Sequence, residues 1–203
     1  MKKVLLGDLI VFAGINRLGK TTQVRRLVSW LQEPGVQAIS ERIKYPIYDL
    51  EPTGPRINAY LRGGNPENWT PLRAQKEYAK NRHDYEQHLL ELLQDDVWVV
   101  AEDYVITGIA WGLANGVPRE VLDEINYGLV KPDIMFMFEG KPFLGATEAG
   151  HLHETDDELT CRAAKIHHDL GREFDCYVIN ANQTEDEVFA QIENIMIRWL
   201  QCR

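Results

Sequence analysis

The chain has 203 residues, of which 44% are hydrophobic, and its formal net charge is −9. This length suits one globular domain with a large core, so we expect a single domain over residues 1–203. The acidic balance argues against a nucleic-acid polymer or an anionic membrane as partner, because phosphate-rich surfaces select basic proteins. Cys161, Cys176 and Cys202 lie far apart without metal-ligand spacing, which predicts free thiols and a cytoplasmic location.

Short apolar runs alternate with helical patterns along the chain. Five runs predict strands that are mostly buried on both faces: Leu9–Phe12, Val36–Ile43, Val97–Ala101, Ile134–Phe138 and Tyr177–Ile179. Asp8 interrupts the first apolar stretch, which is too short to span a bilayer and does not resemble a signal peptide. A buried first strand is the expectation there.

Three helical patterns lie between or after these runs. An apolar stripe within 24–31 predicts a helix that ends before Pro34-Gly35. Thr70-Pro71 predicts the cap and first turn of a long helix toward Leu93. Thr184 and Glu187 have capping-box spacing ahead of a last helix. The alternation predicts an α/β fold, a mostly parallel sheet of about five strands with helices on both faces, whose ligands sit beyond the carboxyl ends of the strands.

The loop after the first strand carries the strongest chemical signal. It fits G-x-x-x-x-G-K-[ST] between a strand and a helix, the context of a phosphate-binding loop. The predicted nucleotide-binding residues are Gly14, Ile15, Asn16, Arg17, Leu18, Gly19, Lys20, Thr21 and Thr22. Lys20 would reach the β- and γ-phosphates of ATP and the Thr21 hydroxyl would bind Mg²⁺. A chance glycine turn is the alternative, and the flanking strand and helix argue against it.

Arg17 lies inside this loop. Its planar guanidinium would stabilise the charge on a phosphoryl group during transfer, which makes it a candidate catalytic residue together with Lys20. The alternative is an arginine that faces solvent. No guanine-recognition signature follows in the chain, which favours a kinase over a GTPase.

Several stretches together resemble the thymidylate kinase family. "FAGINRLGKTTQ" is similar to the family's phosphate loop, and "KYPIYD", "EYAKNRHDYE", "VVAEDYVITGIAW" and "VINANQTEDEV" follow in the family's order over essentially the whole chain. The resemblance implies a nucleoside monophosphate kinase-like P-loop fold with a short lid at about 140–157. It also implies transfer of the γ-phosphoryl group of Mg-ATP to dTMP, giving dTDP, in a homodimer.

The resemblance also implies roles for individual residues. Tyr78 would stack on the acceptor base and Arg82 would hydrogen-bond its carbonyl, and their i, i+4 spacing puts both on one helix face. The other substrate-binding candidates are Tyr45, Pro46, Tyr104, Thr107 and Trp111, and Asn182 would lie near the adenine. A core tyrosine beside a solvated arginine is the alternative for Tyr78 and Arg82. Arg17 would take the catalytic role that lid arginines have in other family members, because 140–157 contains no arginine. His151 and His153 in that segment are expected to be solvated.

The chain departs from the family at three positions. Ala13 replaces an acidic residue, Asn16 replaces an aspartate, and "EDY" replaces Asp-Arg-Tyr, so that Asp103 stands where the family has an arginine. Glu102 would still hold Mg²⁺ through water or orient the acceptor. The candidate replacement cations are Arg42, Lys44, Arg56, Arg73 and Arg162.

These departures leave two alternatives open. A deoxynucleoside kinase would use Glu102 as a base on a sugar hydroxyl, and a non-catalytic nucleotide-binding module would have lost turnover.

Overall fold

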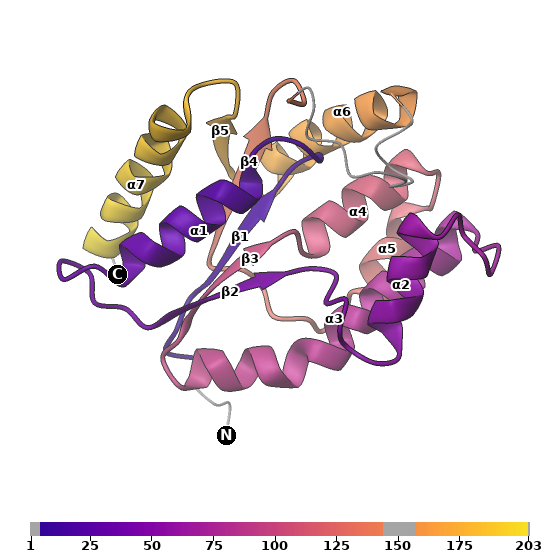
Figure 1. Cartoon of the computed structure of the whole chain (residues 1–203), viewed down its shortest axis with the longest axis horizontal. Coiled ribbons are helices and arrows are strands. Elements are labelled where there is room, and N and C mark those ends of the chain that lie inside the picture. The colour runs from indigo at the N-terminus through magenta and orange to yellow at the C-terminus, as the bar shows by residue number, and fades with distance from the viewer. Residues whose placement is uncertain (1–4, 144–156, 203) are drawn as a thin grey trace.

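The computed structural model of the chain describes residues 5–143 and 157–202. Its centre is a parallel five-stranded sheet in the order β2-β3-β1-β4-β5 (Figure 1). The strands are β1 (Leu9–Ala13), β2 (Ser40–Lys44), β3 (Trp98–Glu102), β4 (Ile134–Glu139) and β5 (Tyr177–Asn180). The predicted α/β fold with a parallel sheet is therefore confirmed.

Helices cover both faces of this sheet (Figure 1). They are α1 (Lys20–Leu31), α2 (Thr53–Arg62), α3 (Pro71–Gln94), α4 (Val105–Ala114), α5 (Arg119–Ile125), α6 (Asp157–Glu173) and α7 (Glu185–Gln201). Thr70 caps α3 through a hydrogen bond that its side chain accepts from the backbone N–H of Arg73. Thr184 and Glu187 form the predicted capping box of α7. In the described parts of the chain, no helix has the length and apolar character needed to cross a membrane.

The alternation of side chains along β1 builds two cores. Ile10 and Phe12 point into one cluster with residues of α1 and α7. Leu9, Val11 and Ala13 point into the other, with residues of α3, α4 and α5. Both faces of β1 are thus fully covered, which explains its uninterrupted apolar sequence. The strand that carries the phosphate loop is held rigidly in the middle of the molecule.

Two details of the strand prediction are wrong. The second strand begins at Ser40 and not at Val36, because Gln37 has a left-handed backbone (φ 58°) and its N–H bonds back to Glu33. The edge strands β2 and β5 are also largely exposed, with Val178 at 50%. An edge strand has a neighbour on one side only, and here the helices cover mainly the central strands.

Helix α2, which no sequence pattern predicted, packs on α3 through a small cluster of its own. The buried residues of this cluster are Ile57, Tyr60, Leu61, Trp69 and Ala74. The rings of Tyr60 and Trp69 stack with centroids 5.2 Å apart. The α2 helix therefore forms a separate wall beside the carboxyl ends of the strands.

Candidate active site

A cavity of about 300 Å³ opens at the carboxyl ends of β1, β2 and β3. The strand order changes direction at this place, because β3 and β4 flank β1 on opposite sides. Such a switch point is where open parallel sheets bind their ligands. The phosphate loop lines one end of the cavity, and α2, α3 and α4 line the other.

The phosphate loop requires glycine at both ends. Gly14 has φ 140°, and a Cβ there would lie 2.6 Å from the carbonyl oxygen of Phe138. Gly19 has φ 76° and forms the N-cap of α1 without a side chain. Lys20 is only 4% exposed, and its Nζ donates to the carbonyls of Gly14 (3.0 Å) and Ile15 (2.8 Å). The ammonium group therefore sits across the concave side of the loop, where it can meet a phosphate.

Glu102 and Thr21 meet at the start of α1. The Thr21 hydroxyl donates to Glu102 Oε1 at 2.8 Å, and Lys44 Nζ lies 3.0 Å from the same oxygen. Glu102 Oε2 is buried and has no hydrogen-bond partner among the described residues. A hydroxyl beside a carboxylate with an uncommitted oxygen is a donor set that suits Mg²⁺. The described residues contain no cluster of three His, Cys, Asp or Glu side chains that would hold a metal by themselves.

Asp103 follows Glu102 in a left-handed backbone conformation, with φ 58°. Aspartate tolerates this conformation better than most residues. Its Oδ1 accepts a hydrogen bond from the Thr107 hydroxyl (3.2 Å) and lies 3.6 Å from Lys20 Nζ. Burial raises the pKa of Asp103, and the nearby Lys20 opposes that rise. The negative charge that replaces the family's arginine is thus paired with a cation.

Arg17 also has a left-handed backbone, with φ 62°. Its side chain lines the cavity, and its Nε is buried without a partner among the described residues. Its carbonyl accepts a hydrogen bond from the backbone N–H of Phe143 at 2.9 Å. The loop arginine is therefore oriented toward the cavity and tied to the segment that follows β4.

The α3 helix presents a stripe of three residues to the cavity: Gln75, Tyr78 and Arg82. Their i, i+3, i+7 spacing places them on one helix face. Arg82 is 4% exposed; its Nε donates to Asn126 Oδ1 at 3.0 Å, while its Nη2 has no partner among the described residues. Burial lowers the pKa of Arg82 to about 10. The guanidinium is still protonated at neutral pH and has a donor left for a ligand.

The Arg82 guanidinium lies directly against α4. A Cβ at Gly108 would be 3.0 Å from Arg82 Nη2 and 3.1 Å from Nη1. Glycine at this helix position is what allows the close approach.

Aromatic residues form the remaining wall. Tyr45 and Tyr104 are buried, with ring centroids 5.0 Å apart. Burial raises the pKa of both hydroxyls. Tyr104 donates to Glu86 (3.4 Å), whereas the Tyr45 hydroxyl has no partner among the described residues. Tyr78 lines the cavity and also packs against the α2 cluster. One part of its side chain therefore belongs to the core, while another part is available to a ligand.

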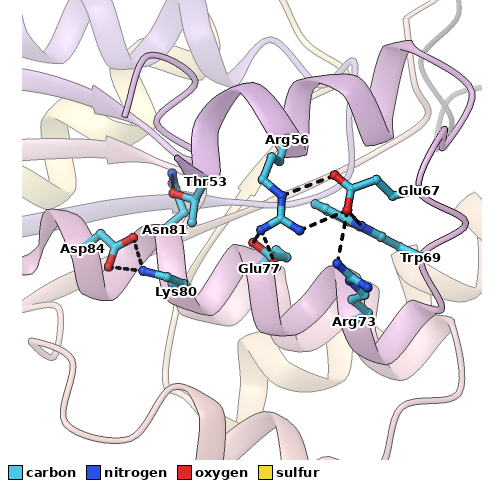
Figure 2. A network of polar contacts seen from close by, with 9 residues as sticks. All are labelled: Thr53, Arg56, Glu67, Trp69, Arg73, Glu77, Lys80, Asn81 and Asp84. Atoms are coloured by element: carbon cyan, nitrogen blue, oxygen red, sulfur yellow. Dashed lines mark hydrogen bonds and ion pairs between the residues drawn. The ribbon is translucent and has the colours of Figure 1, made fainter. Parts of the chain in front are cut away.

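A polar network ties α2 to α3 behind this wall. Figure 2 shows Arg56 of α2 between Glu67 and Glu77, with hydrogen bonds of 3.1–3.3 Å to each. Its guanidinium also lies over the ring of Trp69, 5.3 Å from the centroid. Hydrogen bonds from Arg56 and Trp69 lower the pKa of Glu67. The network holds the first half of α2 against α3, whereas Leu61 and Arg62, which line the cavity, lie at the C-terminal end of α2.

Asn81 anchors the start of α2. It is fully buried, and its Nδ2 donates to Thr53 Oγ1 (2.9 Å) and to the carbonyl of Ile47 (3.0 Å). Its Oδ1 accepts from the backbone N–H of Ile47 at 2.8 Å. The residue beside Arg82 therefore fixes the segment that carries Tyr45 and Pro46, which are joined by a cis peptide bond.

Most of the predicted site residues come together in this cavity. Those that line it are Asn16, Arg17, Leu18, Gly19, Lys20, Thr21, Tyr45, Pro46, Tyr78, Arg82, Glu102, Tyr104, Thr107 and Trp111.

Four predicted residues do not line the cavity: Gly14, Ile15, Thr22 and Asn182. Asn182 instead exchanges two hydrogen bonds with the backbone of Lys141, at 2.6 and 2.9 Å. Residues 144–156 of the predicted lid, including His151 and His153, lie outside the described residues.

Of the five candidate replacement cations, Lys44 alone lines the cavity. Arg56 and Arg73 are bound to Glu67, and Arg162 to Glu158. Arg62 and Gln75 also line the cavity and were not among the predicted site residues. The position of Gln75 three residues before Tyr78 was a usable signal, whereas Arg62 lies on a helix that had no clear pattern.

Comparisons with known proteins agree with this geometry. The family model described as "Thymidylate kinase" matches residues 12–192. A thymidylate kinase of Dictyostelium discoideum is 27% identical, covering 93% of this chain and 84% of its own length. One from Legionella pneumophila is 27% identical, covering 97% of each chain. The solved thymidylate kinase structure from Candida albicans has a TM-score of 0.79 at 20% identity, covering 96% of this chain and 93% of that one. The match to the family model over residues 12–192, on a chain with this phosphate loop and this fold, means that the protein belongs to the thymidylate kinase family.

Proposed function

We propose that the protein is a dTMP kinase in which Mg-ATP is the phosphoryl donor and the described cavity binds the acceptor nucleotide. The observation that carries this proposal is that one cavity is lined by the phosphate loop and also by Tyr45, Tyr78, Tyr104 and Arg82. Phosphoryl transfer requires the two nucleotides to meet in line, and most of the catalysis is positioning and charge stabilisation.

The donor end supplies the cations for the phosphoryl groups. Lys20 sits over the phosphate loop and Arg17 lines the cavity beside it. Thr21 and Glu102 would hold Mg²⁺, directly or through water. The metal ion neutralises charge on the β- and γ-phosphates when it is bound. Arg17 acts on the group in transfer, since its guanidinium has a buried Nε without a partner among the described residues.

The acceptor end is built for a pyrimidine nucleotide. Arg82 Nη2 would donate to a base carbonyl, and the Tyr78 ring would lie against the base. Lys44 would take the role of the missing arginine toward the acceptor phosphate, because it is a cation in the cavity next to Glu102. The pairing of Asp103 with Lys20 reduces the repulsion that Asp103 would exert on that phosphate.

The test is ADP release from ATP with dTMP, with thymidine and without an acceptor. We expect turnover with dTMP that exceeds turnover with thymidine. Faster turnover of thymidine would support a deoxynucleoside kinase, and no acceptor-dependent ADP release would contradict a kinase function altogether.

We also propose a homodimer in the cytoplasm. The dimer rests on the family resemblance, and sedimentation equilibrium tests it. The location rests on the exposed free thiols of Cys161 and Cys202, which suit a reducing compartment.

A further inference from the structure

Gln75 lies in the acceptor end of the cavity. The residue is 4% exposed and lines the cavity from α3, three residues before Tyr78 and seven before Arg82. Its Oε1 is buried and has no hydrogen-bond partner among the described residues. A buried amide oxygen without a partner is costly, so such an atom in a binding cavity points to a hydrogen bond with a ligand.

One face of α3 therefore presents an unpaired hydrogen-bond donor and an unpaired hydrogen-bond acceptor to the cavity. Arg82 Nη2 is a donor and cannot accept, whereas Gln75 Oε1 is an acceptor. A matching ligand edge must offer an acceptor to Arg82 and a donor to Gln75. Thymine has this pattern on adjacent atoms, C4=O and N3–H. Cytosine has the reverse, an amino group at C4 and a lone pair at N3.

We propose that Gln75 is a specificity-determining residue that accepts the N3–H hydrogen bond of the acceptor base. The proposal rests on the proposed function, because it assigns a role within the same acceptor site. Arg82 alone selects a carbonyl at C4. Gln75 adds the requirement for a proton at N3, so that the two residues together select an imide base over an aminopyrimidine.

N3-methyl-dTMP is the probe for this role. The methyl group removes the proton that Gln75 accepts and occupies the space in front of its amide. The experiment measures kcat and KM for dTMP, N3-methyl-dTMP and ATP in the wild type, Gln75→Met and Gln75→Ala. Gln87→Met and Gln87→Ala are matched controls, because Gln87 is an exposed glutamine on the same helix that bonds to Glu91 outside the cavity.

The wild type should prefer dTMP over N3-methyl-dTMP by about 100-fold or more. Gln75→Met should lower kcat/KM for dTMP by about 10- to 100-fold, mainly through KM, and leave the KM for ATP unchanged. Gln75→Ala makes room for the methyl group, so the preference for dTMP should shrink by at least about 10-fold. Partial unfolding would lower the activity with both substrates by the same factor, so it cannot change the ratio of their kcat/KM values. The Gln87 variants should match the wild type.

Three outcomes decide between the possibilities. An unchanged preference in Gln75→Ala, or a wild-type KM for dTMP in Gln75→Met, would overturn the role of Gln75 while leaving the kinase assignment in place. A wild type that does not phosphorylate dTMP would overturn the proposed function, and the role of Gln75 with it. A collapsed preference in Gln75→Ala, with both Gln87 variants normal, supports the proposal.

Discussion

The substitution Gly108→Ala should weaken acceptor binding while leaving the stability of the protein nearly unchanged. Gly108 lies inside α4, where alanine is favoured over glycine by about 0.5–1 kcal/mol. The new Cβ would lie 3.0 and 3.1 Å from the two terminal nitrogens of Arg82, so the guanidinium must retreat by a few tenths of an ångström. Its Nε is held by Asn126, which restricts that movement. We therefore expect nearly unchanged stability and a displaced Arg82.

The size of the effect on acceptor binding follows from the hydrogen bond at stake. A hydrogen bond from a charged group contributes about 1.5–3 kcal/mol, which corresponds to about 10- to 150-fold in affinity. Arg82→Ala removes the whole interaction and gives the upper limit. Gly108→Ala shifts the donor without removing it, so the KM for dTMP should rise by roughly 3- to 10-fold. The KM for ATP should not change.

Gly112→Ala provides the control on the same helix. A Cβ there would lie 2.5 Å from Leu122 Cδ2, in the core between α4 and α5. Overpacking of this kind costs about 1–3 kcal/mol, so this variant should lose stability and keep the KM for dTMP. Urea unfolding and initial-rate kinetics measure the two quantities. The reasoning is refuted if Gly108→Ala keeps the wild-type KM while Arg82→Ala raises it, or if Gly108→Ala unfolds as readily as Gly112→Ala.

Three further predictions test the phosphate end and the fold. Lys20→Ala should abolish turnover and weaken ATP binding. Arg17→Ala should lower kcat by about 10³-fold with a smaller effect on ATP affinity. A nearly normal kcat in Arg17→Ala would exclude the role of Arg17 in phosphoryl transfer. Glu102→Gln should depress kcat sharply, whereas Asp103→Asn should preserve dTMP kinase activity. Equal losses of kcat in the two variants, measured at saturating Mg-ATP, would contradict the assignment of metal binding to Glu102. His167 is buried, and burial lowers its pKa from 6.5 to about 4. The unfolded chain therefore binds this proton more tightly, so the free energy of unfolding should fall by about 3 kcal/mol as the pH drops from about 6.5 to 4. Urea titrations of the wild type and His167→Gln should differ in that pH range, and identical pH dependence would disprove the contribution.

The sequence alone was sufficient for the parts of the molecule that depend on short-range patterns. The apolar runs located the central strands β1, β3 and β4, because strands buried on both faces must be apolar throughout. The other two runs overlapped the exposed edge strands β2 and β5, although β2 begins four residues later than predicted. Thr70 and Thr184 marked helix starts through caps that involve residues only three positions away. The phosphate loop was recognisable for the same reason, since its glycines and Lys20 act within one turn of chain.

Tertiary structure decided everything that depends on contacts between distant segments. The α2 helix carries a weak pattern, and its position depends on Arg56 bonding to Glu67 and Glu77 of the following segment. The sequence left five cations as possible replacements for the missing arginine, and the strand register selected Lys44 by pairing it with Glu102 in the neighbouring strand.

The acceptor pocket shows the same division between local pattern and fold. Tyr78 and Arg82 were predictable from their spacing on one helix, and Gln75 belongs to the same stripe. That the Gln75 amide would be buried without a partner, or that Asp103 would lie beside Lys20, depends on how α3, α4 and the phosphate loop pack together. Which polar atoms are left without a partner and which charges pair depends on neighbours brought together by folding, so the order of residues along the chain could not specify them.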